Sequence, residues 1–175
     1  MPQKKLLWGS LIGYLTVCGM GIVNHFLYAW SGNNPLIGLL TPVNESVWEH
    51  LKLLFIPYLL VLGVEYALYG KKTDGFLFSG TVGVLCGLLL IPLLFYGYEA
   101  WIGRDVPALD ILIYFLSAGV AFLVRYNRIR RGKDSDSGKD SAAVMILLGI
   151  LALFAGFTLY APEAFLFRDP RGSYP

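Results

Sequence analysis

The chain has 175 residues, of which 56% are hydrophobic and only 15% are charged, whereas roughly 25% of the residues in a soluble domain are charged. This composition excludes a soluble globular protein and predicts an integral membrane protein. The small net charge of +2 comes from loop residues rather than from a basic folded surface, so the sequence also excludes nucleic acid as a partner.

Five apolar stretches are each long enough to cross a bilayer, because about 20 helical residues span the roughly 30 Å hydrocarbon core. In chain order they cover residues 6–29, 43–69, 76–98, 108–126 and 142–161. They take up nearly all of the sequence, so residues 1–175 are predicted to form a single transmembrane domain of the all-α class. We expect the first span to be retained, since it is too long for a signal peptide and no small-residue cleavage site follows it.

Small residues recur at helical spacing in two of these spans. Gly9 and Gly13 lie one turn apart in the first span, and Gly83 and Gly87 lie one turn apart in the third. Such pairs let two helix backbones approach each other closely inside a membrane. The pattern predicts a compact bundle, and it leaves the oligomeric state open because the same surfaces serve contacts within one chain.

The basic residues are distributed unequally between the two sets of loops. One set carries ten of the fourteen Lys and Arg residues, namely Lys4, Lys5, Lys71, Lys72, Arg125, Arg128, Arg130, Arg131, Lys133 and Lys139. The other set carries the remaining four, Lys52, Arg104, Arg168 and Arg171. Because cytoplasmic loops are enriched in Lys and Arg, we expect the amino terminus inside and the carboxyl terminus outside, in the cell membrane. Residues 132–141 are polar, which predicts a mobile cytoplasmic linker.

Three polar side chains mark the predicted outer end of the first span. His25 and Tyr28 are three residues apart and Asn24 and Tyr28 are four apart, so an imidazole, an amide and a phenol share one end of the helix. All three groups can form hydrogen bonds to a ligand. The alternative is a histidine that a neighbouring helix simply holds in place.

The start of the predicted second span is dense in ionisable groups. On a helix, Glu45, Glu49 and Lys52 fall within about 60° of one another, whereas His50 points about 100° away from Glu49. Two carboxylates one turn apart repel each other, so this face requires a cation. Lys52 is its simplest source, and the alternatives are a protonated histidine, a metal ion or a substrate. Ser46 and Glu49 also match a capping box, in which Ser46 caps the helix and Glu49 reaches back to it.

Ionisable groups within membrane spans are candidates for function, and further polar groups stand here where apolar ones would suffice. The predicted ligand-binding residues are Asn24, His25, Tyr28, Asn44, Glu45, Trp48, Glu49, His50 and Lys52. The expected ligand is small and polar or cationic. No catalytic motif and no cofactor motif is recognisable in the sequence.

A metal centre is not predicted. The sequence has no His-Glu-x-x-His motif, and adjacent residues such as Glu49 and His50 cannot easily bind one ion together. The weak candidates are His25 with Glu45 or Glu49. A third ligand would then have to come from elsewhere in the chain, for instance from Asp169 or Glu99.

Two further segments have expected structural roles. Glu65 lies in the inner half of the second span, and we expect it to reach the interface or to pair with an arginine of residues 125–131 rather than to carry protons. Residues 160–170 fit neither a regular helix nor a disordered tail, so we expect them to fold over the outer opening of the bundle.

Two motifs carry a resemblance to a known family. They are His25-Phe26-Leu27-Tyr28-Ala29-Trp30-Ser31-Gly32-Asn33-Asn34 and Pro42-Val43-Asn44-Glu45-Ser46-Val47-Trp48-Glu49-His50-Leu51-Lys52. Together with the closing Phe167-Arg168-Asp169-Pro170, Gly172 and Tyr174, they resemble a family of small multi-pass prokaryotic membrane proteins catalogued only as a domain of unknown function. The resemblance covers nearly the whole chain. It implies a small helical membrane protein and no particular substrate, cofactor or catalytic residue.

Three hypotheses of function follow. The first is a binding or transport-related module that recognises a small polar or cationic ligand at Glu45 and Glu49. The second is a membrane-embedded hydrolase in which His25 or His50 is the general base and a carboxylate orients it. The third is a structural scaffold whose polar groups tie the helices together. A pocket with converging His and Glu side chains favours the first two, and complete mutual pairing of these side chains favours the third.

Overall fold

The computed structural model describes residues 3–134 and 137–169, and all the regular elements in these two ranges are helices. The five long helices are α1 (Gln3–Trp30), α3 (Val47–Leu68), α4 (Phe76–Ile102), α5 (Pro107–Arg130) and α6 (Ser137–Leu159). Three short helices are α2 (Pro35–Gly38), η1 (Gly70–Lys72) and η2 (Phe165–Phe167). Each long helix contains a segment that is long and apolar enough to cross a membrane. The prediction of an all-α membrane protein with five spans is confirmed.

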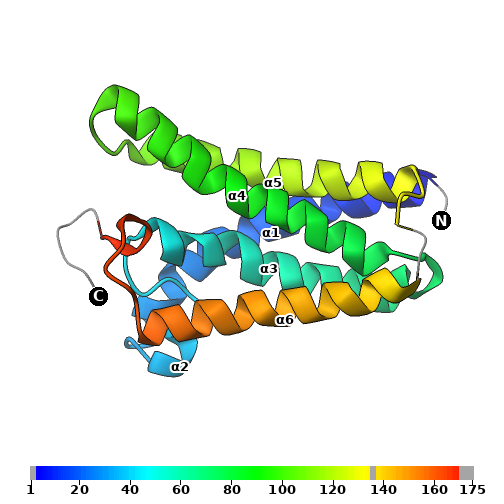
Figure 1. Cartoon of the computed structure of the whole chain (residues 1–175), viewed down its shortest axis with the longest axis horizontal. Helices are drawn as coiled ribbons and strands as arrows, with labels where there is room; N and C mark the ends of the chain where they lie inside the picture. The colour runs from blue at the N-terminus through cyan, green and yellow to red at the C-terminus, as the bar shows by residue number, and fades with distance from the viewer. Residues whose placement is uncertain (1–2, 135–136, 170–175) are drawn as a thin grey trace.

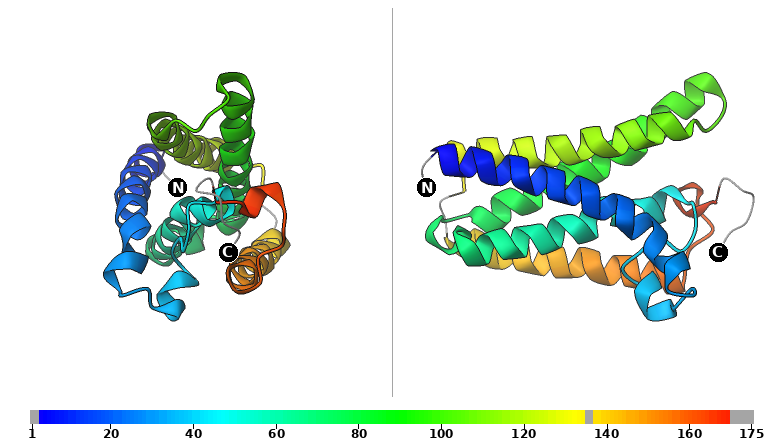
Figure 2. Two further views of the ribbon diagram at one scale, coloured as in Figure 1. Left: turned by 90° about the vertical axis from the view of Figure 1, so that its left-hand side faces the viewer. Right: turned by 180° about the vertical axis from the view of Figure 1, so that it is seen from behind.

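The long helices run side by side along the long axis of the molecule (Figure 1). One end of the bundle, which we call the N end, contains the start of α1 and residues 69–75 and 131–134. The opposite end, which we call the C end, contains residues 31–46, 103–106 and 160–169. Helix α3 lies at the centre and packs against α1, α4 and α6, while α5 packs against α4 and α1. At the C end, the tip of the α4–α5 pair bends away from the other helices (Figures 1 and 2).

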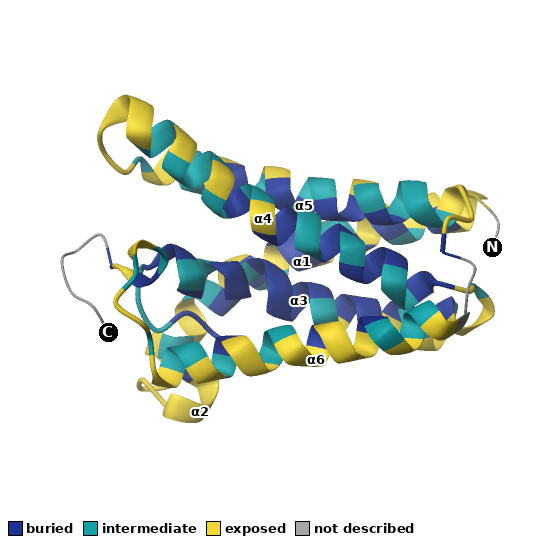
Figure 3. Cartoon of the chain, in the orientation of Figure 1, coloured by how far each residue is buried: buried dark blue, intermediate teal, exposed yellow. Residues whose placement is uncertain are grey.

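The distribution of side chains is that of a protein surrounded by lipid. Large apolar side chains point outward, and Leu89 and Leu148 are 70% and 59% exposed. The central helix α3 is the most continuously buried of the long helices, whereas α6 exposes much of its length (Figure 3). Lys52 and Arg125, in contrast, are buried. Charged groups inside a membrane protein face the interior of the bundle, where they find partners.

The glycine pairs lie at close contacts between helices, as predicted. A side chain at Gly83 would collide with the carbonyl oxygen of Ala121, and one at Gly87 would come within 2.9 Å of the carbonyl oxygen of Ser117. Backbone cannot move aside as a flexible side chain can, so glycine is required where α4 meets α5. In α1, Gly13 leaves room for the side chain of Phe122.

A buried ion pair connects α3 and α5 near the N end. Glu65 and Arg125 form it through Oε2 and Nη1, and the Arg125 side chain is fully buried. The rings of Phe76 and Phe122 lie 5.4 Å and 4.9 Å from the guanidinium carbon, so the cation also contacts aromatic faces. The predicted pairing of Glu65 with an arginine of residues 125–131 is confirmed.

A second set of polar contacts closes the N end. Asp134 accepts hydrogen bonds from Arg128 Nη2 at 2.7 Å and from Ser79 Oγ at 2.8 Å. Asp140 accepts one from the backbone N–H of Phe78 at 2.9 Å. Both carboxylates thus lie at the amino end of α4, where they satisfy donors and complement the helix dipole.

Some helix boundaries differ from the predicted ones. Helix α3 starts at Val47 rather than at residue 43, because Ser46 has the extended conformation of an N-cap, with φ −67° and ψ 152°. Helix α6 starts at Ser137, so residues 137–141 of the predicted linker form its first turn. Asp134 of the same linker is held by Arg128, whereas residues 135 and 136 lie outside the described part of the chain.

Candidate functional site

The C end gathers the polar residues that the sequence singled out. After α1, the chain reverses at Gly32 and Asn33, which both have positive φ angles of 71° and 60°. Asn34 then caps α2 by accepting a hydrogen bond from the Leu36 N–H at 2.9 Å. These turns carry residues 38–46 back across the end of the bundle to the start of α3 (Figure 2).

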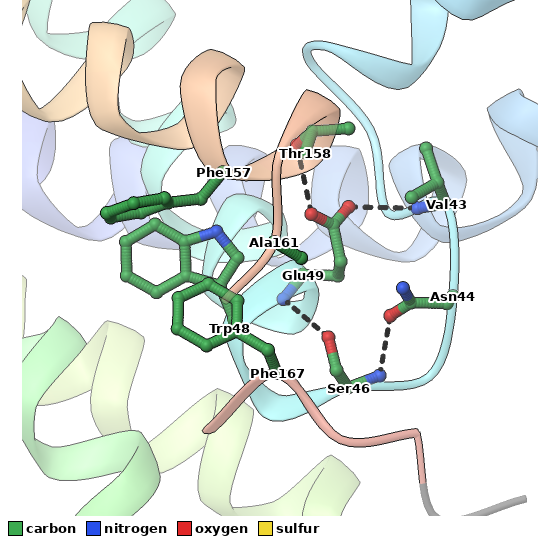
Figure 4. A pocket seen from close by; sticks show the side chains of 9 residues that line it. All are labelled: Val43, Asn44, Ser46, Trp48, Glu49, Phe157, Thr158, Ala161 and Phe167. Atoms are coloured by element: carbon green, nitrogen blue, oxygen red, sulfur yellow. Dashed lines mark hydrogen bonds between the residues drawn. The ribbon is translucent and has the colours of Figure 1, made fainter. Parts of the chain in front are cut away.

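The start of α3 contains half of the predicted capping box. Ser46 Oγ accepts a hydrogen bond from the Glu49 N–H at 3.3 Å, as expected. The Glu49 carboxylate accepts from the Val43 N–H at 3.0 Å, and the Ser46 N–H donates to Asn44 Oδ1 at 2.9 Å (Figure 4). Asn44 therefore takes the place that the capping box assigns to Glu49, which leaves Glu49 available to hold the preceding loop.

Lys52 and Glu49 form a buried ion pair, as the helical spacing predicted. Lys52 Nζ lies 2.7 Å from Glu49 Oε2, and the two side chains are 0% and 3% exposed. The ammonium also donates to the carbonyl oxygens of Gly38 at 3.0 Å and Thr41 at 3.2 Å. Thr158 of α6 contacts both charges, because its hydroxyl accepts from Lys52 and lies 3.0 Å from Glu49 Oε1. This network joins the loop, α3 and α6.

No ligand fits beside Glu49. The space bounded by Glu49, Thr158, Trp48 and Phe157 (Figure 4) contains no volume that a water molecule could enter. Trp48 fills it together with Phe154, Phe157 and Phe167, whose ring centroids lie 4.9 Å, 5.3 Å and 5.0 Å from that of Trp48. The network around Glu49 thus has the closed character expected of a structural contact.

A second cluster lies nearby and consists of His25, Glu45 and His50. Glu45 Oε2 lies 3.5 Å from His50 Nε2, and the imidazole centroids of His25 and His50 are 5.4 Å apart. Taking one ligand atom from each residue, the three atoms lie within 4.8 Å of one another, and all three residues are partly exposed. Two chain segments supply these groups, namely the end of α1 for His25 and residues 45–50, around the N-cap of α3, for the other two.

The predicted face of Glu45, Glu49 and Lys52 does not form. Glu45 precedes the extended residue Ser46 and so lies outside the helix. The helical rotation of 100° per residue therefore does not apply to it. Its carboxylate oxygen Oε2 lies 3.5 Å from His50 Nε2 rather than beside Glu49. The sequence also grouped Glu49 with the metal candidates, whereas the structure places His50 with His25 and Glu45.

Neighbouring groups position the cluster. His50 Nδ1 lies 3.0 Å from the carbonyl oxygen of Ser46. A carbonyl can only accept, so the proton of a neutral His50 ring sits on Nδ1 and the lone pair on Nε2 points to the cluster. Asp169 Oδ2 accepts a hydrogen bond from the Glu45 N–H at 3.2 Å. The segment after η2 therefore crosses the C end and holds Glu45, as predicted for residues 160–169; residue 170 of the predicted segment lies outside the described part of the chain.

The other predicted residues have structural contacts. Asn24 is buried and its Nδ2 donates to the carbonyl oxygen of Leu40 at 3.3 Å. The Tyr28 ring lies against the backbone of Gly38. Sequence reasoning missed Thr158, because a single threonine in an apolar helix carries no local signal of its partners.

A family model covers residues 2–174 of the chain. The chain belongs to DUF6512, a family of unknown function. The resemblance inferred from the two sequence motifs is therefore confirmed at the level of the family. No curated protein and no solved structure matches the chain. Membership supports a membrane protein of this architecture and assigns no activity to it.

Proposed function

We propose that the protein is a cation-binding module of the cell membrane and that its ligand is a divalent transition-metal ion held by His25, Glu45 and His50. The observation that supports this proposal is the convergence of two imidazoles and one carboxylate, with their ligand atoms within 4.8 Å. In this proposal the N end faces the cytoplasm, as the bias of basic residues predicts. The ion then reaches the cluster from outside the cell.

The chemistry of the three groups selects the ion. Imidazole and carboxylate ligands suit Zn²⁺ and Fe²⁺, whereas Ca²⁺ and Mg²⁺ prefer oxygen ligands alone. Ligand atoms around a tetrahedral Zn²⁺ ion lie about 3.3 Å apart, given metal–ligand distances of about 2.0–2.1 Å. Glu45 Oε2 and His50 Nε2 are already 3.5 Å apart, close to this spacing, and all three ligand atoms lie within 4.8 Å of one another.

The contacts behind the ligands also fit a metal site. Histidine ligands usually donate their second ring N–H to a carbonyl or a carboxylate, which fixes the ring and raises its basicity. His50 meets this condition through the Ser46 carbonyl oxygen. Glu49 has no place in the proposed site, because Lys52 neutralises its charge inside the protein.

The two alternatives receive less support. A scaffold explains the Lys52–Glu49–Thr158 network, in which the charges are paired with one another, but not the partly exposed imidazoles of His25 and His50. A hydrolase in which Glu49 orients the histidine base receives no support, because the space beside the Glu49 carboxylate has no room for a substrate. We therefore retain cation binding as the function that the geometry supports best.

Binding of Zn²⁺ to the purified full-length chain in detergent tests the proposal. After removal of metal with a chelator, Zn²⁺ at 100 times its dissociation constant should stabilise the parent by about 2.7 kcal/mol, because it binds only the folded state. His25→Ala and His50→Ala should each abolish the shift in melting temperature. Glu163→Gln is the matched control, since Glu163 is an exposed carboxylate at the same C end of the bundle. Equal Zn²⁺ stabilisation of the parent and both histidine variants would reject the site.

A further inference from the structure

A cavity of about 310 Å³ lies at the N end, well away from the histidine cluster. It opens between the end of α3, helix η1 and the starts of α4 and α6. Its polar lining consists of Tyr66, Lys71, Thr73, Asp74, Asp140 and Ser141. Cavities that bind small molecules have volumes of about 300–1,000 Å³, so this one has room for a group of small-molecule size.

The position of the cavity places it at the level of lipid headgroups. The membrane-spanning segment of α3 ends at Leu68, and those of α4 and α6 begin at Phe76 and Gly138. The cavity therefore lies where the apolar helices meet the polar loops. Leu77 and Val144 form its apolar part, and Val144 is 42% exposed on the face of α6. An amphipathic ligand can therefore place its polar group in the cavity while its apolar part remains in the bilayer.

The charges in the lining indicate a ligand with both signs of charge. Lys71 contributes one positive charge, and Asp74 and Asp140 contribute two negative ones. A purely anionic headgroup would face two carboxylates, and a purely cationic one would face Lys71. Thr73 adds a hydroxyl whose oxygen is buried and has no hydrogen-bond partner among the described residues. A buried hydroxyl without a partner loses stability that a bound acceptor restores.

We propose that this cavity binds the headgroup of phosphatidylethanolamine. Lys71 holds the phosphate together with the Thr73 hydroxyl, which reaches it when the side chain rotates toward the cavity, and Asp74 and Asp140 accept hydrogen bonds from the primary ammonium. Three N–H donors on that ammonium match carboxylate oxygens. The quaternary ammonium of phosphatidylcholine has no such donor and is recognised by several aromatic rings, whereas Tyr66 is the one aromatic residue among the described residues of the lining.

Lipid binding to the full-length chain in detergent tests this site. Native mass spectrometry would compare retention of phosphatidylethanolamine, phosphatidylglycerol and phosphatidylcholine that carry the same acyl chains. We expect the parent to retain phosphatidylethanolamine at least about tenfold better than the other two, a difference of about 1.4 kcal/mol. Lys71→Gln and Asp74→Asn should remove this preference. Both side chains are exposed, so the variants should keep the melting temperature of the lipid-free parent.

Lys72→Gln is the matched control, because Lys72 is the exposed neighbour of Lys71 but does not line the cavity. It should leave the preference unchanged. An equal effect of Lys72→Gln and Lys71→Gln would show general attraction of lipid to basic residues and would overturn the proposal. Tighter binding of phosphatidylglycerol would also overturn it. Soluble phosphoethanolamine should compete only weakly, and competition as strong as that of the whole lipid would make the ligand a soluble molecule rather than a lipid.

Discussion

Replacing Lys52 by methionine tests whether the buried ion pair organises the C end. The variant keeps an unbranched apolar chain and removes the ammonium that lies 2.7 Å from Glu49 Oε2. It also removes the hydrogen bonds to the carbonyl oxygens of Gly38 and Thr41. Glu49, which is 2% exposed, is then a buried charge without its cation. Loss of one partner of a buried pair typically costs about 3–5 kcal/mol, and we expect Lys52→Met to lower the free energy of unfolding by that amount.

The double variant Lys52→Met, Glu49→Gln separates the charge from the packing. Replacing both partners by uncharged groups is often nearly neutral, so the double variant should regain most of the stability that Lys52→Met loses. Groups in one network show coupling of about 0.5–3 kcal/mol. Unfolding in detergent without added metal can be followed by tryptophan fluorescence, to which Trp48 contributes from its position against Phe154 beside the network. A loss below about 1 kcal/mol for Lys52→Met, or simple addition of the two single effects, would refute this reasoning.

Two other predictions concern the packing of α4 and the N end. Gly83→Ala should destabilise the protein by about 1–3 kcal/mol through overpacking against Ala121. Gly97→Ala, at a helical position with open space, should be neutral or stabilising by up to about 1 kcal/mol. Thermal unfolding of the two variants tests both expectations. Burial acts to raise the pKa of Asp134, but hydrogen bonds from Arg128 and Ser79 outweigh it and lower the pKa below its usual 3.8. The resulting stability is present above pH 3.8 and is lost as the pH falls through the lowered value, so Asp134→Asn should flatten the loss of stability on acidification that thermal melts of the parent show.

The fold could be predicted because a bilayer leaves few solutions. Backbone polar groups must be satisfied within each span, so apolar stretches of sufficient length become helices. The boundaries were less accurate, since they depend on single capping residues and not on hydropathy. Ser46 ends the extended segment before α3, and Ser137 stands at the start of α6 inside a stretch that composition alone indicates as linker.

The candidate site was predictable only where helical periodicity applies. Glu49 and Lys52 both lie within α3, and their spacing of three residues predicted the ion pair. Glu45 lies before the N-cap, so the same rule put it on the wrong face and hid its contact with His50. Asp169 reaches the Glu45 N–H from 124 residues further along the chain, and no local pattern predicts such a contact.

A lysine in the interior of a membrane protein requires an explanation, because well-packed apolar residues often stabilise as much as a buried ion pair does. The loop offers one. Gly38 and Thr41 point carbonyl oxygens into the protein, and Lys52 satisfies both. The same contacts fix the path of the chain from α2 to Ser46 and thereby place Glu45 opposite the end of α1. Since Lys52 neutralises Glu49, the carboxylate that faces the imidazoles of His25 and His50 is that of Glu45. The buried network of Lys52, Glu49 and Thr158 thus fixes the loop, and the loop in turn holds Glu45 beside His25 and His50.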